Sequence, residues 1–462
     1  MRRLGLTALV LAFAGCGPGA SPPPERRHPP EPVSTGAEAD PLADPLADIA
    51  GRPPTPREQE AIATLLRVAE RTRNLTFDRP VPFRIQDRDV ITQFVRDQID
   101  AEELERARVF YVAIGLLDPS LDIHDLLIRV LGEQIVGYYD PERSLMVIRE
   151  DVAEQLRPGQ GSRQLGEAEM VIVHELVHAL QDQRLGLGAR YEEERTIDGE
   201  NAFASIVEGD ATLAMIGHMA SRMGQPLSAL TRNAAMLRML IRQNPDAIQG
   251  QEIEQAPPIV RLPLMSRYLD GMILCATLHG QQGWRGVDGL HARPPVTTEQ
   301  VLHPERYLAR ELPDEVPLPA LDDLAAAGLT PHEEDSLGEL ETGIYLGQGL
   351  ADAERDESAA EGWGGDRIRV YRREDGSTAV VWWTTWDDEG EAREAELAAR
   401  RVADASPAER RDRQRVERRG RAVLILRDLD PSLHAPVQAA FGAFADALPS
   451  APPRAESRSN AP

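Results

Sequence analysis

One short segment constrains this chain more than any other: residues 171–180, which read Val-Ile-Val-His-Glu-Leu-Val-His-Ala-Leu. His174 and His178 are four residues apart, and an α-helix of about 3.6 residues per turn places both imidazoles on one face. The apolar residues around them occupy mostly the other faces, which predicts a helix buried inside a domain. Because a buried helix with two histidines on one side is most simply explained by a metal, we expect one zinc ion there.

Glu175 follows the first histidine directly and is predicted to face the side of the metal where a water molecule would bind. Zinc lowers the pKa of such a water to about 7, and a neighbouring carboxylate can take its proton as the water attacks a carbonyl. An H-E-x-x-H string arises by chance about 0.02 times in a chain of this composition. The alternative is a pair of core histidines satisfied by hydrogen bonds.

A catalytic zinc ion usually has three protein ligands and one open position. Gln181 and Arg184 occupy the glycine and last histidine positions of H-E-x-x-H-x-x-G-x-x-H, which excludes a metzincin arrangement. We expect Glu208 as the third ligand, because it lies in a small, apolar helical stretch where a solvated carboxylate is rare. Three other carboxylates are candidates for orienting an imidazole from outside the ligand set: Asp182, Asp198 and Asp210.

Composition excludes several other classes of function. The net charge of −25 argues against nucleic-acid binding, which requires a basic surface. The chain contains no lysine, which excludes Schiff-base chemistry and a P-loop. It also lacks a G-x-S-x-G stretch, the usual signature of hydrolases with a nucleophile elbow.

The N-terminus predicts export. Two arginines precede an apolar run over residues 4–14 that is too short to span a bilayer. The Phe-Ala-Gly-Cys that follows resembles a bacterial lipobox, which implies lipidation of Cys16; an ordinary cleaved signal peptide is the alternative. We expect residues 1–16 to be a lipoprotein signal peptide and the protein to be lipid-anchored at the periplasmic or extracellular face of the bacterial envelope.

The rest of the chain is predicted to be α+β, with a mainly helical first domain that contains a small sheet. Its elements are helices over 55–73, 88–115, 124–131, 199–223, 227–243 and 264–281, a hairpin over 134–148, the histidine helix ending near Gly186, and a loop-rich patch over 283–304. The expected organisation is a Pro-rich disordered tether over 17–56, this domain over 57–310, a linker over 311–335, a C-terminal α+β module over 336–448, and a disordered tail over 449–462.

The C-terminal module is predicted to be a small split sheet with helices on one face. Strands are expected over 367–371, 378–386 and 421–426, and helices over 388–403 and 431–447. On a strand, Trp382 and Trp386 share one face and Trp383 takes the other, which indicates core packing rather than a ligand platform. The Gly-rich stretch 362–366 is either a recognition loop or a tight turn. Cys275, in an apolar stretch, is expected to be a buried small hydrophobe.

Residues 174–183, followed by 207–211, resemble the gluzincin metallopeptidases, in which two histidines and a downstream glutamate hold zinc. More closely, the chain is similar to a bacterial family of exported gluzincin-like proteins; the stretches 132–141, 294–304 and 362–366 support that similarity. The resemblance implies that the metal ligands are His174, His178 and Glu208 and that Glu175 is the general base. It also implies a zincin-like fold, in which an edge strand of a mixed sheet binds the substrate backbone, and the hairpin is the candidate for that edge.

Gluzincins usually also have a Tyr or His that steadies the oxyanion. No motif identifies this residue here, and the candidates are Tyr138, Tyr139, His218 and His303. For His303 the alternative is that it ends a short helix capped by Thr297.

The sequence therefore predicts a zinc-dependent peptidase whose substrates are proteins or peptides of the envelope or the extracellular space. The alternative is a non-catalytic, zinc-bearing envelope lipoprotein that acts as a scaffold or binding protein. An intact Glu175 argues against this alternative, because a structural zinc site requires no base and usually closes its fourth position with protein.

Overall fold

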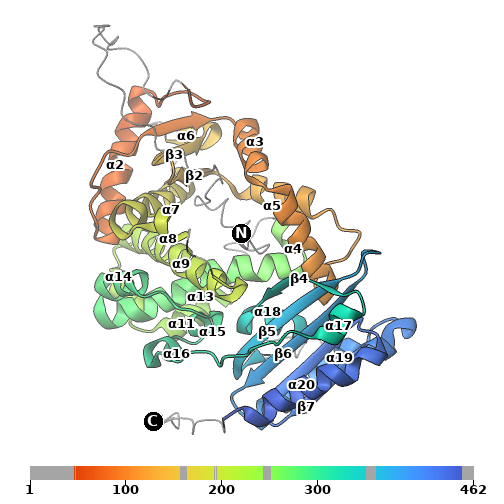
Figure 1. The fold of residues 1–462 in the computed structure, drawn as a ribbon. Helices are drawn as coiled ribbons and strands as arrows, with labels where there is room; N and C mark the ends of the chain where they lie inside the picture. The colour runs from red at the N-terminus through yellow and green to blue at the C-terminus, as the bar shows by residue number, and fades with distance from the viewer. Residues whose placement is uncertain are drawn as a thin grey trace, which may run out of the picture.

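The computed structural model describes residues 46, 48–156, 164–191, 193, 195–242, 251–349 and 360–449. Its fold is α+β, as predicted, with a small and a large sheet at opposite ends of the molecule (Figure 1). Two long helices lie between the sheets, α9 (Ile197–Arg222) and α13 (Pro258–Gln282). The predicted signal peptide, Cys16, most of the tether and nearly all of the tail lie outside the described residues.

The small sheet is mixed and has the order β1-β3-β2. β1 (Phe83–Gln86) runs parallel to β3 (Leu145–Arg149), and β2 (Gly137–Asp140) pairs antiparallel to β3 and forms an edge. The predicted hairpin is therefore present, although β2 begins at residue 137 because the chain before it still belongs to the end of a helix. The outer side of β1 is bridged by Arg52, so part of the predicted tether is packed against the domain.

Helices cover this sheet. α2 (Pro56–Arg73) begins after Thr55, which forms a capping box with Glu58, in agreement with the sequence. The single helix predicted over 88–115 is wrong: the chain forms α3 (Arg88–Gln98) and α4 (Ala101–Ile114). The break occurs because the Asp100 side chain accepts hydrogen bonds from two backbone N–H groups and starts a new helix.

The remaining helices of the N-terminal two thirds follow in order: α5 (Ile123–Gln134), α6 (Glu150–Gln155), α7 (Gln164–Leu185), α8 (Leu187–Tyr191), α10 (Leu227–Thr231), α11 (Ala234–Arg242), α12 (Gln251–Gln255), α14 (Trp284–Ala292), α15 (Thr298–Leu302) and α16 (Pro304–Ala309). α14 and α15 occupy most of residues 283–304, so the prediction of a loop-rich patch there is wrong. Among the described residues, no helix combines the length and the apolar character needed to cross a membrane.

The large sheet has the order β4-β5-β6-β8-β7, and all neighbouring strands are antiparallel. Its strands are β4 (Thr330–Asp335), β5 (Trp363–Arg372), β6 (Thr378–Trp386), β7 (Arg415–Arg419) and β8 (Ala422–Arg427). The predicted linker over 311–335 is wrong, because it contributes α17 (Asp322–Ala326) and β4, and its Leu324 and Leu329 are buried against the sheet.

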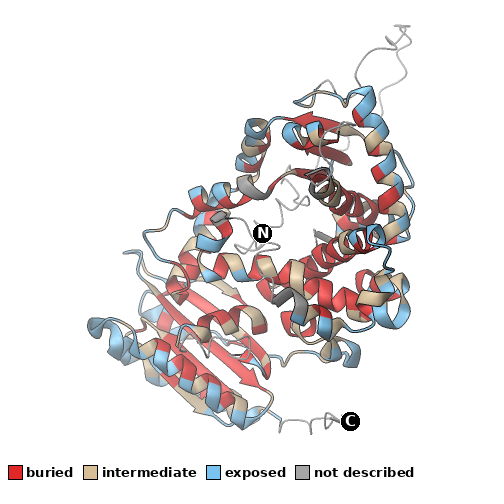
Figure 2. Ribbon diagram, turned by 180° about the vertical axis from the view of Figure 1, so that it is seen from behind, coloured by how far each residue is buried: buried red, intermediate tan, exposed pale blue. Residues whose placement is uncertain are grey.

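Both faces of the large sheet are covered, which corrects the prediction of helices on one face. α18 (Gly338–Gly347) and α19 (Glu389–Asp404) pack on the side of Trp382 and Trp386. α20 (His434–Ala447), preceded by short 3-10 turns at Ala408–Arg413 and Pro431–Leu433, packs on the side of Trp383. The strands are accordingly buried along most of their length, while exposed residues gather on the outward sides of the helices (Figure 2).

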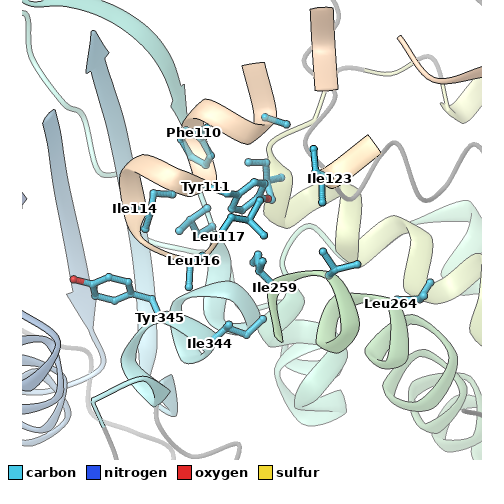
Figure 3. Packing of buried hydrophobic residues seen from close by; sticks show 14 of the residues in the cluster. Phe110, Tyr111, Ile114, Leu116, Leu117, Ile123, Ile259, Leu264, Ile344 and Tyr345 are labelled. Atoms are coloured by element: carbon cyan, nitrogen blue, oxygen red, sulfur yellow. The ribbon is translucent and has the colours of Figure 1, made fainter. Parts of the chain in front are cut away.

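The C-terminal segment is packed against the N-terminal part of the chain, because one face of its sheet shares a hydrophobic core with α3, α4 and α5. Figure 3 shows the centre of this core, where Tyr111 and Ile114 of α4 face Ile344 and Tyr345 of α18. Burial of such side chains contributes roughly 1.5–3 kcal/mol each, so the contact is a substantial part of the stability of the fold.

The closest approach of the two central helices occurs at a pair of glycines. A Cβ atom on Gly209 of α9 would lie 2.1 Å from the carbonyl carbon of Gly271 of α13, and one on Gly271 would lie 1.9 Å from the carbonyl oxygen of Ser205. The backbones are therefore in direct contact, and no side chain larger than hydrogen fits between them.

Replacement of Gly271 by alanine is expected to lower the free energy of unfolding by about 3 kcal/mol, because α9 and α13 must separate to admit the methyl group. Chemical denaturation monitored by circular dichroism measures this. The matched control is Gly289→Ala, since Gly289 lies inside α14 with no neighbouring atom within 4 Å of a Cβ; its stability should stay unchanged or rise by up to about 1 kcal/mol. Equal effects of the two substitutions would contradict the contact.

Candidate metal centre

Helix α7 presents the two histidines on one face, as the sequence predicts. The Nε2 atoms of His174 and His178 lie 3.1 Å apart, and both side chains are buried. The apolar residues Ile172, Leu176 and Leu180 belong to the core between α2 and the small sheet, and they hold the histidines toward α9. α7 ends at Leu185, before a glycine with a φ of +70°, which is also as predicted.

Glu208 of α9 completes a triangle of donor atoms. Its Oε2 lies 3.1 Å from Nε2 of His174 and 3.5 Å from Nε2 of His178. A tetrahedral zinc ion with bonds of 2.0–2.1 Å separates neighbouring ligand atoms by about 3.3 Å. The three donors are therefore of the types that zinc prefers and are spaced as its ligands are, so the residues fit the ion that the sequence predicts.

The electrostatics of the triangle favour a positive charge at its centre. Burial alone would raise the pKa of Glu208, but the two histidines lower it to about 2, so the carboxylate stays ionised. Burial opposes protonation of His178, but the Glu208 carboxylate raises the pKa of His178 to about 9. A divalent cation bound by the same three atoms would balance the negative charge of the Glu208 carboxylate in place of the proton on His178.

Glu175 lies beside the triangle. A ligand atom of Glu175 and those of both histidines lie within 4.8 Å of one another. Within the described part of the chain its Oε2 has no hydrogen-bond partner, although the atom is buried. Burial raises the pKa of Glu175 to about 8, while a hydrogen bond from the backbone of Tyr139 on edge strand β2 lowers it. A buried carboxylate oxygen without a partner is costly, which indicates room for a group that is bound during function.

The amide of Gln181 fixes the orientation of His178. Its Nε2 donates to the carbonyl oxygen of Val207 and to Oδ2 of Asp210, each at 3.0 Å. Because both partners can only accept, Oε1 of Gln181 faces Nδ1 of His178, 2.9 Å away, and Nδ1 carries the proton. In the neutral ring that a bound metal requires, Nε2 is then the atom with a lone pair, and it is the atom that points at His174 and Glu208.

Asp210 accepts a hydrogen bond from Gln181, so the structure brings this predicted carboxylate to the site, but it does not contact the imidazole of His174 or His178 directly. Asp210 also accepts a hydrogen bond of 2.9 Å from Nε2 of His291 and forms an ion pair of 2.6 Å with Arg73, which is fully buried. These partners hold the pKa of Asp210 well below its ordinary value despite its burial.

Tyr268 of α13 is a further side chain at the centre that no sequence motif identified. Its ring centroid lies 5.9 Å from that of His174. Burial, together with the carboxylates of Glu208 and Glu175 and a hydrogen bond to Glu208, raises the pKa of its hydroxyl well above the usual value. The phenol is therefore neutral and remains a proton donor. Its only sequence signal is an Arg-Tyr pair at 267–268 between apolar residues of a mixed helix.

The other carboxylates predicted to orient an imidazole have different partners. Asp182 accepts a hydrogen bond of 2.9 Å from the hydroxyl of Tyr139 and pairs with Arg79 at 3.2 Å. Asp198, whose pKa burial raises to about 7, accepts hydrogen bonds from the backbone and hydroxyl of Thr298 at 2.7 and 2.6 Å. The predictions that these two residues orient a ligand are therefore wrong, because both are satisfied elsewhere.

None of the four residues proposed to steady an oxyanion brings its side chain to the triangle among the described contacts. Tyr138 stacks on Phe94 with ring centroids 4.6 Å apart, and the hydroxyl of Tyr139 is bound to Asp182. His218 and His303 pair with glutamates, Glu169 and Glu339, each at 2.8 Å. His303 also ends α15, which Thr297 caps, as the alternative interpretation predicted. Cys275 is buried as expected.

A second group of carboxylates with metal-like spacing consists of Glu299, Glu311 and Asp387. The guanidinium of Arg306 forms ion pairs with Glu311, with Asp387 at 2.6 Å and with Glu299 at 3.9 Å. A cation of the chain itself thus occupies this group, which makes it a structural ion cluster rather than a metal centre.

Comparison with known proteins concerns mainly the large sheet. Residues 328–436 match the model of a family described as a domain of unknown function (DUF8575). The matched span begins just before β4 and ends within α20, so it contains none of the metal-centre residues. No curated protein and no solved structure matches the chain.

Replacement of Gln181 by methionine is expected to weaken zinc binding by about 10- to 100-fold, because His178 loses the acceptor that fixes its tautomer. Competition with a chromophoric chelator measures the affinity. Gln183→Met is the matched control, since Gln183 lies on the same helix but binds the backbone of residues 78 and 79. A Gln181→Met protein that binds zinc as tightly as the parent would refute this role of the amide.

Proposed function

We propose that the chain is a zinc-dependent peptidase of the gluzincin type, which hydrolyses peptide bonds in envelope or extracellular proteins and is held at the bacterial cell envelope by a lipid on Cys16. The observation that carries the proposal is the triangle of His174, His178 and Glu208, with the partnerless oxygen of Glu175 beside it. Zinc, when bound, supplies Lewis acidity toward a substrate carbonyl and acidifies water.

The protein's own groups have distinct tasks in this proposal. Glu175 takes a proton from the attacking water and later returns it to the leaving amine, as a general base and then a general acid. Its position next to both histidines and the absence of a fixed partner on Oε2 suit this task. The charge of a cation bound at the triangle would lower the pKa of Glu175 and so favour the ionised form that a base requires. Tyr268 is neutral and hydrogen-bonded to Glu208; its hydroxyl would donate to a negatively charged oxygen once it turns away from Glu208.

The position of edge strand β2 supports the proposal of a peptide substrate. It packs against α7, and the backbone of Tyr139 reaches Glu175. The other edge of this sheet, at β1, is bridged by Arg52. An extended peptide that adds to β2 as a further strand would be held by backbone hydrogen bonds next to the proposed base.

The second candidate function is a zinc-bearing scaffold without catalysis. A structural zinc site usually has four protein ligands and no open position. Three donors converge here, and Glu175 is left with a free oxygen instead of closing the site. This difference favours the peptidase.

Two substitutions separate binding from chemistry. Glu175→Gln is expected to keep about one zinc per chain and to lose roughly 10²–10⁴-fold in peptide hydrolysis, because the amide cannot take a proton. Glu208→Ala should lose both zinc and activity, because two histidines remain as ligands. Metal analysis by mass spectrometry and hydrolysis of casein or a quenched fluorescent peptide measure the two properties.

Glu169→Gln is the matched control, because Glu169 lies on α7 and pairs with His218 and Arg222 away from the triangle. It should bind zinc and hydrolyse peptides like the parent. Equal activity of the parent and the Glu175→Gln protein would remove Glu175 from its proposed role. Zinc without any hydrolysis in the parent would favour the scaffold.

A further inference from the structure

The segment that matches the family model contacts the helix that carries Glu208. We propose that Asp335 and Glu341, both from this segment, are positioning residues of the metal centre: they hold the first turns of α9 and so determine where the Glu208 carboxylate lies. This inference rests on the proposed function, and it assigns the large sheet a part in the metal centre in place of a separate binding role.

The first anchor is at the N-terminus of α9, where helical N–H groups have no partner within the helix. The N–H of Ile197 donates to Oδ1 of Asp335 at 2.9 Å, and the N–H of Asp198 donates to the carbonyl oxygen of Ser336 at 3.1 Å. Thr196 itself caps only Gly199. Two donors of the first turn are therefore satisfied by residues far along the chain, and a carboxylate at this end also suits the helix dipole.

The residues around this first anchor are tightly packed. Gly338 has a φ of +71°, and a Cβ atom there would lie 1.8 Å from Oδ1 of Asp198. The same oxygen is held from the other side by Thr298, whose hydroxyl also accepts a hydrogen bond of 3.2 Å from the N–H of Leu340. The start of α9 is thus enclosed between α15 and α18, and it cannot shift unless one of them moves.

The loop that makes this contact is fixed to the large sheet by Asp366 of β5. The carboxylate of Asp366 accepts hydrogen bonds from the hydroxyl of Ser336 at 2.8 Å and from the N–H groups of Leu337 and Gly338, each at 3.0 Å. It also accepts one of 3.0 Å from the indole N–H of Trp382. Asp366 is the last residue of the Gly-rich stretch 362–366, so that stretch contributes the carboxylate that holds this loop.

The second anchor lies one turn further along α9 and is fully buried. Glu341 of α18 accepts hydrogen bonds from the hydroxyl of Tyr111 at 3.0 Å and from Nδ2 of Asn201 at 3.2 Å. Oδ1 of Asn201 accepts a hydrogen bond of 3.0 Å from Arg267. The next residue, Tyr268, is the tyrosine that binds Glu208, so this network approaches the metal centre along α13 as well.

The anchors act on Glu208 through an uninterrupted helix. From Ile197 to Glu208 the helix advances by about 16 Å at about 1.5 Å per residue. Asn201 and Glu208 are seven residues apart, which is close to two turns, and they lie on the same side of α9. A displacement at the start of a packed helix moves the carboxylate with it, and an error of about 1 Å at a reactive centre can reduce the rate by about 10²-fold.

The test replaces a helix-capping aspartate that contacts α9 and compares it with one that does not. Asp335→Ala removes the acceptor of the Ile197 N–H. Asp388→Ala is the matched control, because Asp388 caps α19 of the large sheet through the N–H groups of Gly390 and Glu391. Three properties are measured on the full chain: zinc affinity by chelator competition, kcat and KM on a fluorescent peptide, and amide hydrogen exchange over 197–210 in the metal-free protein.

For Asp335→Ala we expect zinc affinity to fall by about 10- to 100-fold, kcat to fall by at least about 10-fold with little change in KM, and exchange over 197–210 to accelerate. Asp335→Asn, which keeps an acceptor oxygen, should restore zinc affinity to within about 3-fold of the parent. Asp388→Ala should lower the melting temperature without changing zinc affinity or exchange in α9.

The inference is overturned if a folded Asp335→Ala protein binds zinc and exchanges like the parent, or if Asp388→Ala weakens zinc binding equally. If Asp335→Ala does not fold, Thr298→Val is used, which removes the hydroxyl between Asp198 and Leu340; unchanged zinc affinity then overturns it. A parent that binds zinc without hydrolysing peptides refutes only the peptidase, and the affinities still decide the positioning. A parent that binds no zinc refutes both.

Discussion

Helix α9 is buried along almost its whole length, so a polar side chain on it is costly unless it has a partner inside the protein. Its polar residues accordingly connect it to its neighbours: Asp198 to α15, Asn201 to α18 and α13, Glu208 to α7, and Asp210 to α2 and α14. The candidate metal centre, where Glu208 meets His174 and His178, is one of these connections. The requirement to satisfy buried polar groups explains why elements far apart in sequence converge on a single helix.

The three candidate metal ligands could be predicted because the signal for each lies close to it in the sequence. The spacing of His174 and His178 and the apolar surroundings of Glu208 require only helical geometry to be interpreted, and the structure brings all three side chains together. The residues that support them could not be found in this way. His291 and Tyr268 come from α14 and α13, whose placement against α7 depends on tertiary packing, and neither belongs to a motif. Gln181 lies one turn after His178 on α7, but its orientation depends on Val207 and Asp210 of α9.

The errors in the fold have similar causes. The pattern over 88–115 is apolar at helical spacing throughout, and the break depends on one capping aspartate, Asp100. The sequence predicts a linker where β4 lies, because a stretch of Pro, His and acidic residues has little intrinsic preference for a strand. The strand forms because it pairs with β5. Helices on both faces of the large sheet were foreseeable, since β6 has a nearly continuous apolar run, which is typical of strands buried on both sides.

The order of the small sheet has a consequence for molecular recognition. With β1 bridged by Arg52, the edge of this sheet at which a further strand could pair is that of β2, beside α7, where the backbone of Tyr139 already contacts Glu175. A polypeptide that pairs with such an edge must already be extended, and a proline at a pairing position would remove one of its donors. If the proposed peptide substrate pairs at this edge, its backbone conformation is selected first, so flexible loops and unfolded segments would be accepted more readily than helices, whatever their side chains.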